Sequence, residues 1–399
     1  MRRTASALSV IAISMFLFAS FAGTGAHTDD AEDAVGSGGT GTPDTSWYDV
    51  TATSFEIGTA DQLAGLSEIV NGTASGILKD SFLNKTVTLT DDVDLSAYGR
   101  GYNGGRGWVH IGDIYADAFK GMFDGAGHKI TGLYINAFDS LNGYNVGLFG
   151  AVVGGTVKNI GVEGAEIHGV ESIGAVAGFI SLGGTVTNCY STGVISGENY
   201  VGGITGANGV GSSVTNCYSS CNVSGNKFIG GIVGYDSDTG MTSNCYSMGI
   251  VKGVNSVGGI AGLVSSGRVV NCAALNPSVT GEENTGRVAG LITAGGVCTD
   301  NLAFAGMSKT PAKSGNNGTG ITPAKISEDG TLGGRFTEAG GWTAENGSLP
   351  GLFGGTVETP EYILKWKQSF MSAYMVIAVI VVIIAAAVAV YILKTRKRN

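Results

Sequence analysis

The residue types that most often carry catalysis or bind metals are sparse in this chain. It has four histidines, and no two have the spacing of metal ligands; they are His27, His110, His128 and His168. The signatures HExxH, GxSxG and GxxxxGK[ST] are absent from the sequence. We therefore expect no metal, no cofactor and no enzymatic activity.

Carboxylates offer one route to chemistry, because a pair of them can hydrolyse a glycosidic bond. We call positions that recur about every 28 residues a column, and the acidic residues of the central stretch do not share one. They are Glu163, Glu166, Glu171, Glu198, Asp236, Asp238, Glu282 and Glu283. Asp236 and Asp238 resemble the start of a calcium loop, but the rest of such a loop is missing, so a solvated turn is expected.

Four of the six cysteines occupy one column, namely Cys189, Cys217, Cys245 and Cys272. Ile160 and Leu302 hold the same place in the first and last repeats, so this column is predicted to face an apolar interior. Equivalent residues of stacked strands lie about 4.8 Å apart, within disulfide range, but their parallel side chains would strain the bridge. Free thiols are favoured over disulfides, and a zinc site is less favoured still because no CxxC motif or paired histidine accompanies them.

Tyr190, Tyr218 and Tyr246 follow these cysteines and are predicted to point outward as an aromatic stripe. The simpler interpretation is a stacked ladder that stabilises its face. The alternative is a platform that binds sugar rings or a partner protein, which makes these three tyrosines the candidate ligand-binding residues.

The elements that would position these side chains are sequence repeats. Columns with a 28-residue step run from 141 to 307, one of them through Gly150, Gly178, Gly206, Gly234, Gly262 and Gly290. Such a period indicates a solenoid in which each unit buries its apolar face against its neighbours. The apolar residues are β-branched and come in short runs, which favours strands over helices.

Bends are predicted inside each unit, because apolar residues stand three apart where strict alternation would need two. One bend falls on Gly202 and Gly203, and another on an asparagine column, since both residue types tolerate positive φ. The asparagines are Asn159, Asn188, Asn216, Asn244, Asn271 and Asn301, and they could form an amide ladder. We predict an all-β, right-handed parallel β-solenoid of three strands per 28-residue coil, with a cap at each end.

The glycine motifs, GLFG at Gly147–Gly150 and GGIVG at Gly230–Gly234, resemble those of the GLUG-motif repeat family. The flanks FEIGTADQLAGLSEIVN from Phe55, TVTLTDDVDL from Thr86 and FKGMFDGAGHKITGLYI from Phe119 are similar to that family too. The resemblance covers about 51–353. It implies a cell-surface or adhesin-like protein, and such repeats also accompany IgA-specific metalloendopeptidases.

The N-terminal third is predicted to lead into the solenoid. Residues 1–26 have two arginines and an apolar run, as in a secretory signal peptide. Residues 27–45 are expected to be a flexible acidic Gly/Ser linker, whose GxGxxG lacks the strand and helix of a nucleotide site. Residues 46–140 are predicted to be a β-rich cap with a short helix at Ala60–Val70, capped by Thr59 and Gln62.

The C-terminal part is predicted to close the solenoid and anchor it. Residues 308–368 form a cap and linker, in which five apolar residues could cover the last coil: Phe336, Trp342, Leu349, Leu352 and Phe353. Residues 369–393 are uncharged and long enough for a transmembrane helix, and the basic tail 394–399 places the C-terminus in the cytoplasm.

The chain of 399 residues has a net charge of -9, and its concentrated basic residues lie beside the predicted anchor, so no nucleic-acid partner is expected. Five sequons could carry glycans outside the cell: Asn71, Asn84, Asn222, Asn317 and Asn346. We predict a single-pass membrane protein with an extracellular ectodomain that acts in adhesion or cell-envelope structure. Its partners would be the lipid bilayer and, at the ectodomain, glycans or surface proteins. The alternative is a carbohydrate-active β-helix lyase or hydrolase on the cell surface.

Overall fold

The computed structural model describes residues 37–113, 115–138, 143–293, 295–308, 316–366 and 380–384. The predicted signal peptide 1–26, the tail 394–399 and most of the predicted span 369–393 lie outside the described residues. Within the described ranges, no helix has both the length and the apolar character needed to cross a membrane.

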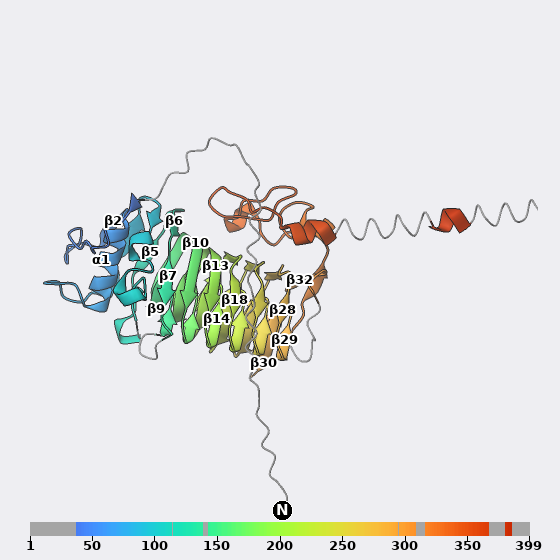
Figure 1. The fold of residues 1–399 in the computed structure, drawn as a ribbon, viewed down its shortest axis with the longest axis horizontal. Coiled ribbons are helices and arrows are strands. Elements are labelled where there is room, and N and C mark those ends of the chain that lie inside the picture. Colours follow the sequence, from blue (N-terminus) through green and yellow to red (C-terminus); the bar gives the residue numbers. More distant parts are fainter. Residues whose placement is uncertain are drawn as a thin grey trace, which may run out of the picture. The chain divides into compact units, whose positions relative to one another are not determined.

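The chain folds into a right-handed parallel β-solenoid of about nine turns. Figure 1 shows its strands following one another along the stack in sequence order. The largest sheet, sheet A, begins each turn with one strand: β2 (Ser54–Ile57), β3 (Thr86–Leu89), β5 (Met122–Asp124), β10 (Thr156–His168), β13 (Thr185–Ser196), β16 (Ser213–Thr215), β21 (Met241–Ser243), β26 (Arg268–Val270) and β31 (Val297–Thr299).

Two further rows complete sheet A, and the long strands β10 and β13 run through all three rows. One row holds β1 (Ser37–Gly38), β4 (Val93–Asp94), β6 (Lys129–Thr131), β17 (Tyr218–Ser219), β22 (Tyr246–Ser247), β27 (Ala273–Ala274), β32 (Leu302–Phe304) and β33 (Thr319–Ile321). The other row holds β7 (Tyr134–Asn136), β18 (Asn222–Ser224), β23 (Val251–Lys252) and β28 (Val279–Thr280).

Two six-stranded sheets form the other faces. Sheet C contains β8 (Tyr144–Val146), β11 (Glu171–Ile173), β14 (Asn199–Gly202), β19 (Lys227–Gly230), β24 (Asn255–Gly258) and β29 (Glu283–Gly286). Sheet B contains β9 (Phe149–Val153), β12 (Ala177–Ser181), β15 (Thr205–Asn208), β20 (Val233–Ser237), β25 (Ala261–Ser265) and β30 (Ala289–Thr293). A coil therefore has three faces as predicted. The coils that begin with β10 and β13 have three strands, as predicted, whereas those that begin with β16, β21 and β26 have five short ones.

The strand register confirms the 28-residue columns. Val201 of β14 pairs with Ile229 of β19, which pairs with Val257 of β24. Each pair stacks one coil on the next, so every backbone ladder is closed by a neighbouring coil and the β-branched side chains line a continuous core.

The asparagine corner has the predicted conformation, with φ between 51° and 57° from Asn159 to Asn271. Part of the amide ladder forms, since Asn188 Nδ2 donates to Asn159 Oδ1 at 3.1 Å and Asn271 Nδ2 donates to Asn244 Oδ1 at 2.6 Å. The prediction is wrong in the last coil, where Asp300 has φ 57° and Asn301 is buried.

The glycine corner has a different cause from the one predicted. Gly202 and Gly203 do not have positive φ. A Cβ on Gly203 would lie 2.2 Å from the carbonyl oxygen of Gly231, and one on Gly202 would lie 2.1 Å from that of Thr205. These positions therefore need glycine because backbones approach closely there.

The column cysteines are buried and, with the other two, are free thiols. Burial raises the pKa of Cys217, Cys245 and Cys272 well above the ordinary thiol value. They act as small apolar side chains in the core, as the sequence favoured.

The N-terminal segment 46–140 forms the first coils of the solenoid, since β2, β3 and β5 continue the first row of sheet A. The predicted helix is α1 (Ala60–Asn71); Thr59 accepts from Gln62 N, and Gln62 Oε1 accepts from Gly58 N. Short 3-10 turns follow it at η1 (Ser96–Tyr98), η2 (Asn103–Gly105) and η3 (Tyr115–Asp117). Part of the predicted linker is ordered, because β1 pairs with β4 and Thr40 N donates to Asp61.

The C-terminal segment contains α2 (Pro323–Ile326), η4 (Glu338–Gly340) and a helical stretch at 361–366. Phe336, Trp342 and Phe353 do not cover the last coil as predicted. Trp342 and Phe353 pack instead on the tyrosine column at the flank of the solenoid, 5.7 Å from Tyr246 and 6.0 Å from Tyr190 between ring centroids. The last coils are contacted by 361–366, where Trp366 lies against Phe304 of β32.

Candidate functional site

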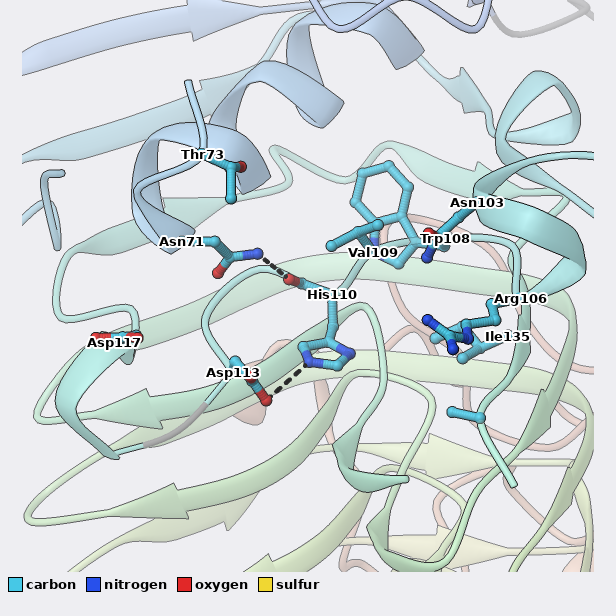
Figure 2. Close-up of a pocket in the computed structure, with 11 residues that line it drawn as sticks. Asn71, Thr73, Asn103, Arg106, Trp108, Val109, His110, Asp113, Asp117 and Ile135 are labelled. Carbon is cyan, nitrogen blue, oxygen red and sulfur yellow. Dashed lines mark hydrogen bonds and ion pairs between the residues drawn. The ribbon is translucent and has the colours of Figure 1, made fainter. Parts of the chain in front are cut away.

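A polar pocket of about 320 Å³ lies at the N-terminal end of the solenoid (Figure 2). The end of α1 contributes Asn71 and Thr73, and the loop between β4 and β5 contributes the charged groups Arg106, His110 and Asp113. Asn103, Trp108, Val109, Asp117, Ile135 and Ala137 complete its lining.

The loop is fixed by the helix and by the coil beneath it. Ser67 Oγ donates to Val109 O at 2.8 Å, and Asn71 Nδ2 donates to His110 O at 2.9 Å. The indole of Trp108 donates to Leu148 O at 3.1 Å, which attaches the loop to the next coil. The pocket walls are thus held by partly or fully buried hydrogen bonds, so the pocket is formed before any ligand binds.

His110 and Asp113 contact each other inside the pocket. The distance from His110 Nε2 to Asp113 Oδ1 is 3.3 Å. The hydrogen bond from His110 lowers the pKa of Asp113 below its ordinary value, so this carboxylate is ionised near neutral pH. Figure 2 shows the Arg106 guanidinium on the other side of the imidazole from Asp113. The pocket therefore offers donors and acceptors to an oxygen-rich ligand.

The tyrosine column is a stacked ladder, as the simpler interpretation predicted. Ring centroids of Tyr190, Tyr218 and Tyr246 are 5.0 Å apart and the rings are nearly parallel. Tyr218 is only 8% exposed and Tyr246 is 0% exposed. Tyr246 Oη also donates to Pro350 O at 2.5 Å. The C-terminal segment thus covers most of the surface that a sugar platform would need, and Tyr190 and the 8% exposed Tyr218 line a hollow beside Phe353.

Asp236 is not in the solvated turn that the sequence predicted. Its side chain is 0% exposed, and its Oδ1 accepts from Asn208 Nδ2 at 3.1 Å. Burial raises the pKa of this carboxyl to about 7. Asp238 is exposed two residues later, so the two carboxylates do not face one site.

The remaining carboxylates do not converge either. Glu163 accepts from Tyr190 Oη at 2.6 Å, and Glu166 pairs with Arg100. Two pairs of glutamates do share a column, contrary to the prediction. Glu171 and Glu283 lie four coils apart in sheet C, and Glu198 and Glu282 lie three coils apart.

The described histidines each lie near a carboxylate, which the sequence did not suggest. His128 Nδ1 is 3.2 Å from Asp92, and His168 Nε2 is 3.3 Å from Glu166. Among the described residues no group of three or more His, Cys, Asp or Glu side chains could hold a metal ion. His27 lies outside the described residues.

The sequons differ in accessibility. Asn84, Asn222 and Asn346 are exposed, and Asn317 is half-buried. The side-chain amide of Asn71 is part of the pocket wall. Its Nδ2 donates to His110 O and its Oδ1 accepts from Gly112 N, both at 2.9 Å. A glycan on that nitrogen would displace these contacts.

Comparison with known proteins finds similarity over short stretches and shows no family. No family model matches the chain. It is 36% identical over 112 residues to Halomucin of Haloquadratum walsbyi and 40% identical over 94 residues to a "Putative Gly-rich membrane protein" of Evansella cellulosilytica. These matches cover 28% and 23% of this chain but only 1% and 10% of those proteins.

One solved structure supports the fold. The crystal structure of a "putative immunoglobulin A1 protease" from Bacteroides ovatus matches with a TM-score of 0.51 and 22% identity. The match covers 68% of this chain and 85% of that one. At this identity the likeness concerns the fold alone.

Proposed function

We propose that this protein is a membrane-anchored surface protein whose solenoid ectodomain acts in adhesion or cell-envelope structure by binding ligands. The similarity of short stretches to a membrane protein and to Halomucin supports a place at the cell surface. The anchor would be 369–393, and the ectodomain would lie outside the cell.

The observation that carries the proposal is the preformed pocket of the N-terminal coils. A guanidinium carries five N–H donors, so Arg106 can donate to a ligand carboxylate or hydroxyl in addition to its contacts within the protein. Asp113 and Asn103 supply acceptors on the facing walls. Such a site suits an oxygen-rich group, for example the end of a glycan or an acidic side chain of a surface protein.

A second function, an enzyme, is favoured by one feature of the same pocket. An imidazole beside a carboxylate is the arrangement of a general base. The residues that line the pocket include no serine or cysteine, but they include Thr73, Asp113 and Asp117, and a carboxylate can act as nucleophile or base in a glycosidase. A lyase or hydrolase would use His110 or one of these carboxylates to activate water or to abstract a proton. Binding requires only the groups already placed, and we therefore prefer it.

The test compares wild type with Arg106→Ala and His110→Gln in a ligand screen by saturation-transfer NMR, using oligosaccharides and acidic peptides. The same samples are assayed for product release. Lys252→Ala is the matched control, because Lys252 is an exposed cation on β23, in a distant coil. We expect at least a tenfold loss of affinity in Arg106→Ala, no loss in the control, and no product from any sample. Product formation that His110→Gln abolishes would establish the enzyme instead.

A further inference from the structure

A column on sheet C has an unusual backbone. Six of its residues have φ between 50° and 62°: Asn145, Ser172, Tyr200, Phe228, Ser256 and Asn284. Asparagine tolerates this left-handed conformation, whereas bulky side chains rarely adopt it. Tyr200 and Phe228 therefore stand where the backbone favours small polar residues. Aromatic rings kept at such positions point to a use for the rings.

The rings form an ordered cluster on the outside of the coils. Tyr200 and Phe228 stack with centroids 5.2 Å apart and planes 8° apart. Tyr200 also stacks on Tyr235 of β20 at 5.3 Å. Phe228 in the next coil covers one face of the Tyr200 ring. The other face looks toward the preceding coil, where the column carries only Ser172.

A hollow of about 310 Å³ lies beside that open face. Its floor is Ala207, which follows Phe179 and precedes Tyr235 in the outward column of sheet B. Because Phe179 and Tyr235 are two coils, or about 10 Å, apart, the small alanine leaves room for a ring between them. Asn145, Glu171 and Ser172 supply polar groups at the rim.

We propose that this hollow binds a pyranose unit of a neutral glycan. The apolar C–H face of the sugar would stack on Tyr200, and its hydroxyls would donate to Glu171 and exchange hydrogen bonds with Ser172 and Asn145. The carboxylate of Glu171 repels uronic and sialic acids, which makes neutral sugars the preferred class. Burial, and after it the charge of Glu171, raises the pKa of Tyr200, as expected if this carboxylate lies near the phenol. The inference rests on the proposed adhesion function and names its ligand class at a second site.

The test uses the purified full chain in detergent on an array of neutral glycans and their uronic-acid counterparts. Tyr200→Asn is the decisive variant, because asparagine suits the positive φ and the variant should fold at least as readily. Tyr235→Ala is a second variant that leaves φ at 200 unchanged. Phe138→Ala is the control, since Phe138 is an exposed aromatic residue that stacks on His168 and does not line the hollow.

We expect wild type and Phe138→Ala to bind neutral glycans, and both variants of the hollow to lose at least tenfold in affinity with unchanged unfolding temperatures. Equal binding by Tyr200→Asn, equal binding of uronic acids, or no glycan binding by wild type would overturn the inference. If wild type shows Arg106-dependent ligand binding but none that depends on Tyr200, this inference fails while the proposed function stands. If it shows neither, both fail.

Discussion

Replacing Asp236 by asparagine should make the protein more stable at neutral and alkaline pH. Asp236 is fully buried, and its pKa is raised from 3.8 to about 7 because burial disfavours the charged form. The folded state therefore holds the proton more tightly than the unfolded state between about pH 4 and pH 7. Over that window the free energy of unfolding falls as pH rises, and above pH 7 the loss is complete.

The size of the effect follows from the shift. About three pKa units at about 1.4 kcal/mol each amount to about 4 kcal/mol. Asparagine has nearly the same shape and carries no charge, so Asp236→Asn avoids this penalty. At pH 8 the variant should melt about 5–10 °C above wild type, and at pH 4 the two should be within about 2 °C.

The assay is thermal unfolding of wild type and variant by circular dichroism at half-unit steps from pH 4 to pH 8. The difference between the two curves isolates Asp236, because carboxylates with lowered pKa, such as Asp80 and Asp124, contribute equally to both. Asp238→Asn, at an exposed carboxylate two residues away, should show no comparable pH-dependent difference. A melting-temperature difference that does not change with pH would refute the reasoning.

Four further predictions concern packing and access. Tyr246→Ala removes a ring that is 0% exposed beneath the C-terminal segment. We expect the free energy of unfolding to fall by about 3–5 kcal/mol, measured by chemical denaturation. Proteolysis within 316–366 should also become faster, measured by limited digestion. Gly203→Ala places a Cβ 2.2 Å from Gly231 O and should lower the free energy of unfolding by at least about 2 kcal/mol in chemical denaturation. The control Gly320→Ala, whose Cβ would have nothing within 4 Å, should lower it by less than about 1 kcal/mol. In a glycosylating host, Asn346 should be modified more fully than Asn71, because the Asn71 side chain is hydrogen-bonded to His110 and Gly112. Glycopeptide mass spectrometry measures the occupancy of each site. Full occupancy of Asn71 would contradict its place in the pocket wall. Cys217 should react with a thiol reagent only on unfolding, because its thiol is buried and its pKa is raised.

The repeat architecture was predictable because its signal is periodic. Columns 28 residues apart require equivalent residues to stack, and Val201, Ile229 and Val257 pair as that reasoning requires. The asparagine corner was predictable for a local reason, since its residue type tolerates the positive φ found there. The glycine corner was located correctly but explained wrongly, because a close approach of two coils is a tertiary contact that leaves no mark on one coil alone.

The candidate sites were not predictable in the same way. Asp236 looked like a surface residue because it stands in a polar run, yet it lies beside Asn208 inside the core. His110 had no ligand spacing in the sequence, and its partner Asp113 is an unremarkable acid three residues later. One signal could have been used: Tyr200 and Phe228 share a column with Ser172, Ser256 and two asparagines, and such a change of residue type within a column marks a place where the ring has its own role.

The tyrosine column shows that the repeat alone does not predict where the segments that flank it will pack. The column predicted the stacked ladder of tyrosines, but it did not predict that the C-terminal segment would cover them. Phe336, Trp342 and Phe353 belong to a segment without periodicity, so the sequence could not say whether they would pack on the end or on the side of the solenoid. The structure places them on the side, which turns a candidate binding face into an internal interface.

The most direct test of the claim that the ectodomain binds surface ligands is a cell-retention assay. Cells that display the full chain are passed under flow over an immobilised layer of envelope glycans and surface proteins, and the retained cells are counted. We predict that cells displaying wild type are retained well above cells without the protein. Loss of Arg106 and Tyr200 together should bring retention down to that background while surface display stays equal. Equal retention of the double variant, or wild-type cells that detach like empty cells, would contradict the account.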